Sequence, residues 1–375
     1  AFKQVVGSKS SEPKVKGNSD IHKTYAFGMR SDDESETVGN FYDLQSFIET
    51  PGNHYAFFVS MQYIRLSELV NSKTQAKNAG KELGNGNSTS KENEMLKADI
   101  LKTDWDLIII DEAHEGTLTS LGKGVIQDFL KKEKTKMLYL SGTPFNLYED
   151  FNGDEIYTWD YIAEQTAKHN WSLEHPNEKN PYAELPKMNI FTYDITKNID
   201  NILDQTGVFS FPEFFRTWTG NPKADKASMP EGAKGRFVHE PEVSEFLDLL
   251  CKKDAENNFP FSTNEYRQMF RHTLWVVSHV NEAAALEQLL KEHKIFRHFD
   301  VVNVAGRNET DEQNENALDK VLKAIGDNPE KTSTITISCG RLTTGVTVAP
   351  WTAVFYLKGG DRAATYMQTI FRVQS

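Results

Sequence analysis

The sequence is poor in cysteine and contains no long apolar run. Its 375 residues include only two cysteines, Cys251 and Cys339, far apart in the chain. So few thiols argue against a disulfide framework or a cysteine-bound zinc site and are typical of reduced intracellular proteins. No stretch approaches the roughly 18 consecutive apolar residues of a membrane-spanning helix. We therefore expect a cytoplasmic protein that does not cross a bilayer.

Basic residues are fewer than acidic ones, and the N-terminal residues do not resemble a leader sequence. Lys and Arg total 42 against 54 Asp and Glu, a formal net charge of -12. This balance argues against binding nucleic acid through overall basicity, but it permits a local basic groove. The N-terminus, AFKQVVGSKSSEPKVKG, has neither an apolar core nor an initiator methionine. We expect a fragment of a longer protein, with two domains because the chain exceeds one compact core.

The first third of the chain alternates apolar runs with a helical pattern. Runs at 54–61 (HYAFFVSM), 105–111 (WDLIIID) and 137–144 (MLYLSGTP) predict buried strands, and 121–133 (LGKGVIQDFLKKE) has helical spacing. Strand, helix, strand is typical of a parallel sheet. Residues 71–94 hold almost no apolar side chains and predict a surface loop.

The last third repeats this alternation and predicts a second α/β unit. The residues between the two, 148–266, scatter aromatics among Pro, Asn and Lys and predict helical and loop insertions. A polar stretch there, GNPKADKASMPEGAKG, runs from Gly220 to Gly235. The elements predicted for the last third are strands at 272–278, 299–306, 333–338 and 353–357 and helices at 281–293 and 316–326.

Two adjacent carboxylates, Asp111 and Glu112, directly follow the apolar run LIII. Ligands of parallel α/β sheets gather at the carboxyl ends of strands, so charged residues there fall where chemistry occurs. One carboxylate can hold Mg²⁺ and its neighbour can accept a proton from an attacking water, as phosphoryl transfer from a nucleotide requires. An acidic loop is the commoner explanation of such a pair alone. The order Asp-Glu-Ala-His at 111–114 reverses that preference.

The DEAH sequence resembles motif II of the superfamily 2 helicases and translocases, and four further stretches match that family in order. They are YLSGTP at 139–144 (motif III), WVVSHVNEA at 275–283 (motif IV), SCGRLTTGVTV at 338–348 (motif V) and YMQTIFR at 366–372 (motif VI).

The resemblance implies an α/β fold of two RecA-like, parallel-sheet domains of the P-loop NTPase type. Residues 1–147 would be the C-terminal part of the first domain. Residues 148–266 would be a linker and helical insertion, and 267–375 a truncated second domain.

The resemblance also implies ATP and Mg²⁺ as cofactors and assigns roles at the nucleotide site. Asp111 would bind Mg²⁺, Glu112 would orient and deprotonate the attacking water, and His114 would couple the site to motif VI. The hydroxyls of Ser141 and Thr143 could hydrogen-bond the motif II acids when nucleotide is present.

In motif VI, Arg372 would reach the γ-phosphate as an arginine finger, with Gln368 four residues earlier on the same helix face. Contacts to the nucleic-acid backbone are expected from the motif V residues and from Gln62, directly after the apolar run at 54–61. Gln62 could instead serve only as a cap. The predicted nucleic-acid contacts are Gln62, Thr343, Thr344 and Gly345.

The sequence departs from the family in three places. The phosphate-binding pattern G-x-x-x-x-G-K-[ST] is absent, and VVGSKSS near the N-terminus lacks its spacing. We therefore expect that loop upstream of this chain, and little hydrolysis by the chain alone. Phe371 replaces the usual Gly of motif VI, and Thr347 stands where many relatives carry Asp.

The long middle insertion, with GTPFN and MQTIFRVQS, looks most like motor subunits of restriction systems and related bacterial or phage DNA helicases. This likeness implies DNA as the partner, duplex more than RNA, and a nuclease or methylase in another domain or subunit. The alternatives are a silent scaffold or pseudo-ATPase, an RNA helicase, and a motor attached to a nuclease. ELPK at 184–187 contains Pro and does not favour a nuclease core. For Trp159, Trp171 and Trp218, core positions are favoured over a stacking platform.

Overall fold

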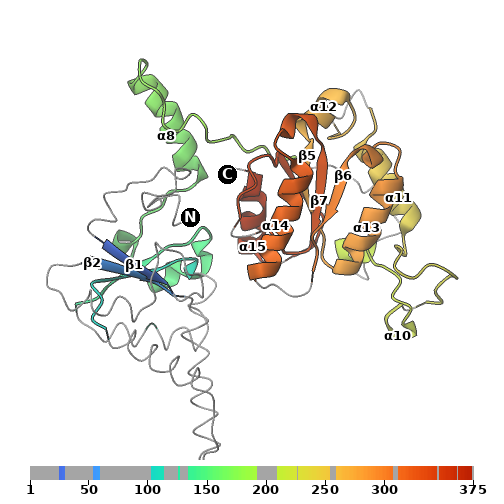
Figure 1. Cartoon of the computed structure of the whole chain (residues 1–375), viewed down its shortest axis with the longest axis horizontal. Helices are drawn as coiled ribbons and strands as arrows, with labels where there is room; N and C mark the ends of the chain where they lie inside the picture. The colour runs from blue at the N-terminus through green and yellow to red at the C-terminus, as the bar shows by residue number, and fades with distance from the viewer. Residues whose placement is uncertain are drawn as a thin grey trace, which may run out of the picture. The chain divides into compact units, whose positions relative to one another are not determined.

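The structure is a computed structural model of the whole chain (Figure 1). The residues that it describes are 25–29, 54–59, 103–113, 126, 134–191, 209–225, 227–253, 259–306, 311–343, 346–360 and 362–373. The chain divides into two compact units, Ala1–Asp150 and Phe151–Ser375. Both contain parallel strands. The predicted loop at 71–94 lies outside the described residues, as does the helix predicted at 121–133, except for the buried, helical Ile126.

The described residues of the first unit form two pairs of parallel strands. β1 (Tyr25–Met29) pairs with β2 (His54–Phe58), and β3 (Leu107–Ile110) pairs with β4 (Lys136–Tyr139). Strands form at the runs 54–61, 105–111 and 137–144, each shorter than its run, with β4 beginning one residue early at Lys136. The expectation that they are buried is wrong for β4, none of whose residues is buried, and for Phe58 of β2, which is 46% exposed. β1 was not predicted from the sequence.

The apolar run of β3 is buried less than its composition predicts. Ile110 is 6% exposed, whereas Leu107 and Ile109, which point to one face of the strand, are 49% and 54% exposed. Ile109 lies opposite Leu138 of β4, which is also exposed at 43%. The prediction of a wholly buried strand is therefore wrong for this face, because neighbouring residues of a strand point to opposite sides and only one side is covered.

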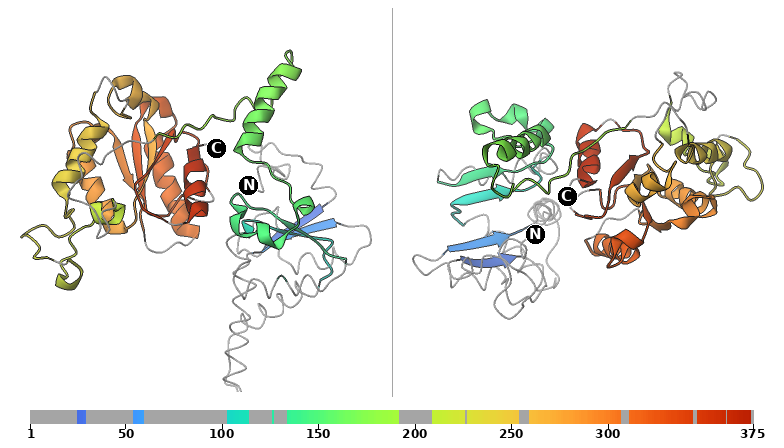
Figure 2. Two further views of the ribbon diagram at one scale, coloured as in Figure 1. Left: turned by 180° about the vertical axis from the view of Figure 1, so that it is seen from behind. Right: turned by 90° about the horizontal axis from the view of Figure 1, so that it is seen from above.

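The second unit is built on a four-stranded parallel sheet in the order β6-β7-β5-β8. This confirms the alternating elements expected in the last third. Helices lie on both faces of the sheet (Figures 1 and 2). The strands of this sheet and the helices between them are, in chain order, β5 (His272–Val276), α13 (Val280–Glu292), β6 (Asp300–Asn303), α14 (Asp311–Ile325), β7 (Thr334–Ser338) and β8 (Ala353–Tyr356).

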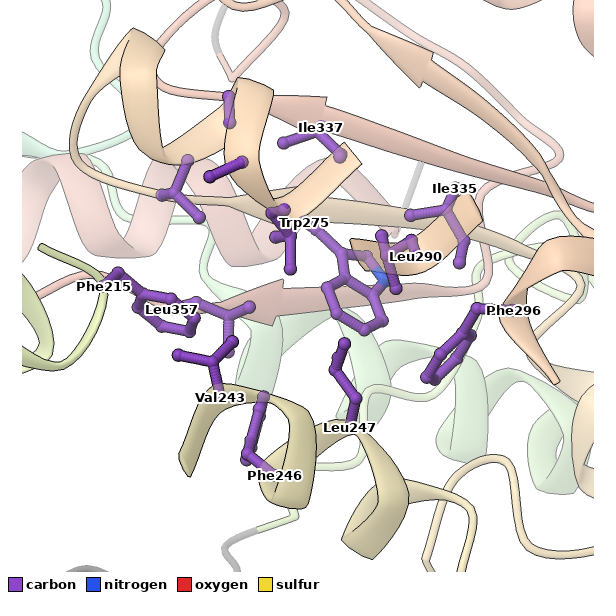
Figure 3. Close-up of a cluster of buried hydrophobic side chains, with 14 of the residues drawn as sticks. Phe215, Val243, Phe246, Leu247, Trp275, Leu290, Phe296, Ile335, Ile337 and Leu357 are labelled. Atoms are coloured by element: carbon purple, nitrogen blue, oxygen red, sulfur yellow. The ribbon is translucent and has the colours of Figure 1, made fainter. Parts of the chain in front are cut away.

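Alternating side chains of β5 divide the core between the two faces of the sheet. Trp275 is fully buried in a cluster with Leu247 of α11 (Glu240–Leu250) and Leu290 of α13, as Figure 3 shows. Leu274, also fully buried, packs on the opposite side with residues of α14. A fully buried strand rich in β-branched and aromatic residues is typical of a parallel sheet covered on both faces.

The remaining described elements are helices and 3₁₀ turns. Trp218 is only 9% exposed, in agreement with the core position favoured for it. Trp159 is 49% exposed, so a core position is wrong for this residue. The Trp171 ring stacks on the His175 ring, with ring centres 4.2 Å apart. The other helices are α8 (Tyr161–Glu174), α9 (Phe211–Phe214), α10 (Pro222–Asp225), α12 (Asn264–Met269) and α15 (Ala363–Ile370), with 3₁₀ turns η1 (Pro144–Asn146), η2 (Tyr148–Asp150), η3 (Gly153–Glu155), η5 (Phe296–His298), η6 (Pro329–Lys331) and η7 (Phe371–Val373).

Two composition-based expectations concern membrane spans and cysteines. Among the described helices, none has both the length and the apolar character needed to span a bilayer. Cys251 and Cys339 are both free. Burial raises the pKa of the Cys251 thiol to about 12, so this cysteine stays protonated and poorly nucleophilic at neutral pH.

A buried histidine at the start of β5 ties the sheet to the turn before β7. The His272 ring is 1% exposed, with Nε2 2.8 Å from the Pro329 carbonyl oxygen and Nδ1 2.9 Å from the Thr334 hydroxyl oxygen. A neutral ring satisfies both contacts, because Nε2–H donates to the carbonyl and Nδ1 accepts from the hydroxyl. Burial lowers the pKa of His272 below its ordinary value of 6.5.

We expect acid to destabilise the folded chain through His272. As pH falls below 6.5 the unfolded chain takes up a proton that folded His272 resists, so the free energy of unfolding decreases down to the lowered pKa. Urea unfolding on either side of that pH measures this loss. His272→Gln should reduce this decrease in the free energy of unfolding. His169→Gln, on the exposed surface of α8, is the control and should keep the wild-type pH dependence. Equal pH dependence in His272→Gln and the wild-type chain would contradict the assignment.

Candidate functional site

The acidic pair forms the turn at the carboxyl end of β3. Asp111 and Glu112 are both exposed, whereas the next residue, Ala113, is 1% exposed. The Ala113 N–H donates to the Leu140 carbonyl at 3.0 Å, and the Leu140 N–H donates to the Ile110 carbonyl at 2.9 Å. These bonds fix the turn beside the end of β4. Because the two carboxylates remain in water, placing them next to an apolar strand costs little desolvation energy.

The backbone of this turn is strained at the residue expected to act as the base. Glu112 has a φ of 46°, in the left-handed region that costs a residue other than glycine about 1–2 kcal/mol. Its N–H donates to Oδ1 of Asp111 at 2.9 Å, which holds the two residues together. Strained positions of this kind cluster at active sites and ligand clamps.

Hydroxyl residues follow the neighbouring strand at the same edge. Thr143 is 3% exposed, and its N–H donates to Oγ of Ser141 at 3.2 Å. Pro144 then begins η1, which ends the extended backbone. Four predicted site residues therefore lie at the carboxyl ends of two paired strands: Asp111, Glu112, Ser141 and Thr143.

One carboxylate of this turn could serve a magnesium ion that arrives with a nucleotide. Within the described residues no three His, Cys, Asp or Glu side chains gather closely enough to form a metal site of their own. Mg²⁺ keeps several waters and commonly takes one or two carboxylates with the phosphates of its nucleotide. The exposed Asp111 carboxylate fits that requirement.

The predicted motif VI residues lie at the end of α15. The helix ends at Ile370 and Arg372 falls in η7, so Gln368 and Arg372 do not share one α-helical face as the spacing predicted. Helix ends commonly tighten into a 3₁₀ turn. The Arg372 Nε donates to the Gln368 carbonyl at 3.0 Å and its Nη1 to the Val346 carbonyl at 2.7 Å. The guanidinium thus joins α15 to the end of the motif V segment.

The predicted motif V contact residue Thr343 is occupied within its own turn. It is 5% exposed, and its hydroxyl donates to the Gly340 carbonyl at 2.5 Å. A phosphate contact by this side chain would require the turn to rearrange. The preceding Leu342 has a φ of 61°, so this segment, like the acidic turn, contains a left-handed residue other than glycine. The predicted site residues outside the described part of the chain are Gln62, His114, Thr344 and Gly345.

Two cations at the carboxyl edge of the second sheet were missed from the sequence. Lys358 follows β8; burial lowers its pKa below the usual 10.5, and Nζ lies 5.7 Å from the centre of the Tyr356 ring. Arg341 follows β7, and its guanidinium fills the space that a Cβ on Gly306 would need. A charged residue directly after a predicted strand was the signal that identified Asp111, and it applies to Lys358, which follows the strand predicted at 353–357. Arg341 is separated from β7 by two residues, so this signal is weaker for it.

Comparisons with known proteins connect the chain to restriction-modification proteins. No family model matches. The chain is 30% identical over 285 residues to the "Putative type II restriction enzyme and methyltransferase RM.MpnORF110P C-terminus" of Mycoplasma pneumoniae (strain ATCC 29342 / M129 / Subtype 1), a match of 71% of this chain. The match spans 38% of the relative's length.

A solved structure, "ATP-dependent Type ISP restriction-modification enzyme LlaBIII bound to DNA", aligns with 93% of this chain and 21% of its own. The TM-score is 0.41 and the identity 13%, too low to establish a shared fold. The sequence relative is therefore the more informative of the two similarities.

Proposed function

We propose that the chain is part of an ATP-dependent DNA helicase or translocase motor of superfamily 2 in a restriction-modification system. The observation that carries the proposal is the acidic turn, in which exposed Asp111 and strained Glu112 end β3 beside Ser141 and Thr143. This is the carboxyl edge of a parallel strand pair, where α/β proteins bind ligands.

In this proposal residues 1–147 and 267–375 are the two RecA-like domains, and 148–266 is the linker and insertion. Mg-ATP, when bound, supplies the phosphoryl group and the ion that neutralises its charge. Asp111 binds the ion, and Glu112 orients and deprotonates the attacking water. Ser141 and Thr143 hydrogen-bond these acids.

The remaining predicted residues connect the nucleotide to DNA. His114 couples the acidic turn to motif VI. Arg372, four residues after Gln368 in motif VI, stabilises charge on the γ-phosphate after leaving its present backbone partners. Gln62, Thr343, Thr344 and Gly345 contact the DNA backbone, without reading its sequence.

The link to restriction is supported by sequence similarity to a protein described as a restriction enzyme and methyltransferase. Because the chain spans 38% of that relative, nuclease and methylase activities are assigned to other domains or subunits. The absence of a G-x-x-x-x-G-K-[ST] pattern in these 375 residues favours a second candidate, a catalytically silent scaffold with the same fold.

ATP hydrolysis with and without duplex DNA distinguishes the two candidates. It should be measured on the 375-residue chain and on a form extended into the coding sequence upstream, where a phosphate-binding loop is expected. Hydrolysis stimulated by DNA in the extended form, with little in the shorter one, supports the motor. No hydrolysis in either form contradicts it and favours the scaffold.

A further inference from the structure

The polar stretch GNPKADKASMPEGAKG forms most of a loop closed at its base by paired backbone. Thr217 and Phe237 form an antiparallel bridge, and the Trp218 N–H donates to the Arg236 carbonyl at 2.9 Å. Phe237 and Trp218 are 2% and 9% exposed, so the base is anchored in the core. We call residues 217–237 the base-closed loop. Around α10 it extends away from the sheet of the second unit (Figure 1).

A buried carboxylate fixes the first half of this loop. Asp225 is 2% exposed and accepts hydrogen bonds from the Thr219 N–H and hydroxyl, both at 2.8 Å, and from the Gly220 N–H at 2.9 Å. Oδ1 of Asn221 accepts the N–H of Lys223 at 3.1 Å. The backbone is thus held in place up to Lys223, and the charge of Asp225 is directed inward.

The second half of the loop places another lysine near the first turn. The aliphatic stem of Lys234 lies over Gly220, with Cδ 3.4 Å from the position that a Cβ would take there. Gly220 has a φ of 76°, which favours glycine. Carbons Cγ, Cδ and Cε of Lys234 thus lie beside Gly220, and the residue as a whole is exposed.

The arginines at the base are paired, whereas the two lysines are not. Arg216 Nε lies 2.9 Å from Glu213 Oε1, and Arg236 forms a two-point pair with Glu240. Neither Lys223 nor Lys234 has an ion pair with another described residue, and both are exposed. The loop thus presents two lysines without an ion pair and one exposed carboxylate, Glu231, on a chain whose formal net charge is -12.

We propose that the base-closed loop contacts the phosphate backbone of duplex DNA through Lys223 and Lys234. The inference rests on the proposed function, in which the chain acts on DNA, and adds a contact surface outside the helicase-like motifs. Among its described residues the loop has no exposed large apolar side chain that could anchor a protein partner. Small polar residues around exposed lysines suit phosphate contacts, which depend on charge and not on base sequence.

The test is binding of the 375-residue chain to a labelled duplex oligonucleotide, followed by fluorescence anisotropy over a range of salt concentrations. The double variant Lys223→Ala/Lys234→Ala should bind more weakly at every salt concentration. The slope of log affinity against log salt should become less steep by about 2, roughly 1 for each lysine that no longer neutralises a phosphate. Lys223→Gln/Lys234→Gln, which keeps the aliphatic stem over Gly220, should show the same weaker binding and the same change of slope as the double alanine variant.

Lys320→Ala/Lys323→Ala on α14 removes the same charge from an exposed helix and should leave affinity and slope near wild type. Thermal unfolding of each variant verifies that it is folded. Wild-type binding by the loop variants, or an equal loss in the α14 control, overturns the loop proposal and leaves the motor proposal standing. A wild-type chain that does not bind duplex DNA even at low salt overturns the loop proposal and counts against DNA as the partner of the motor.

Discussion

Replacing Glu112 with glutamine should leave Mg-ATP binding intact and lower ATP turnover by about 10²–10⁴-fold, the usual contribution of a positioned general base. Glutamine has nearly the same shape and can occupy the same left-handed backbone, where Glu112 has a φ of 46°. It cannot accept the proton of the attacking water. Steady-state hydrolysis and equilibrium nucleotide binding, both in the form extended upstream, separate these two effects.

Two matched variants make this result specific to the acidic turn. Asp111→Asn should weaken Mg²⁺-dependent nucleotide binding itself, because it removes the charge that would hold the ion. Glu149→Gln, at an exposed carboxylate in η2 of the same unit, should change neither binding nor turnover. If Glu112→Gln turned over ATP at the wild-type rate, the assignment of Glu112 as the base would be wrong.

Replacing Trp275 with alanine should lower the free energy of unfolding by about 3–5 kcal/mol. The indole is 0% exposed, stacks on Phe355 with ring centres 4.8 Å apart, and meets Phe296 edge-on at 5.6 Å. Its Nε1–H donates to the Thr273 hydroxyl at 2.9 Å, so the substitution also removes that donor. Such a loss is a large fraction of the roughly 5–15 kcal/mol that stabilises a typical domain.

Urea unfolding followed by circular dichroism measures this loss. Tyr157→Ala, at an aromatic residue that is 86% exposed, is the control and should shift the unfolding free energy by no more than about 0.5 kcal/mol. Comparable stability of Trp275→Ala and wild type would show that β5 does not form the centre of the core.

The sequence was most informative where a local pattern decides the structure. The runs HTLWVVS and STITIS become β5 and β7, because a strand buried on both faces consists mostly of apolar or β-branched residues. The position of Asp111 and Glu112 after β3 followed from the abrupt change from apolar to charged residues.

Features that depend on distant parts of the chain could not be read in this way. The exposure of Ile109 depends on what covers one face of β3, and the insertion of β7 between β6 and β5 depends on pairing across the whole unit. The contact of Arg372 with the Val346 carbonyl joins residues 26 positions apart, so helical spacing, which pairs Arg372 with Gln368, could not predict this second partner. No local pattern indicated the left-handed backbone of Glu112, since glutamate has no preference for it.

The strand order of the second unit has a consequence for the synthesis of the protein. β5 and β6 emerge first from the ribosome, yet they never pair with each other, because β7 lies between them. Until Ser338 has been made, both strands present open hydrogen-bonding edges, a hazard for aggregation. Such non-local pairing slows folding. Apolar residues of α13, which lies between β5 and β6 in the sequence, cover one face of β5 but leave its hydrogen-bonding edge open until β7 is available.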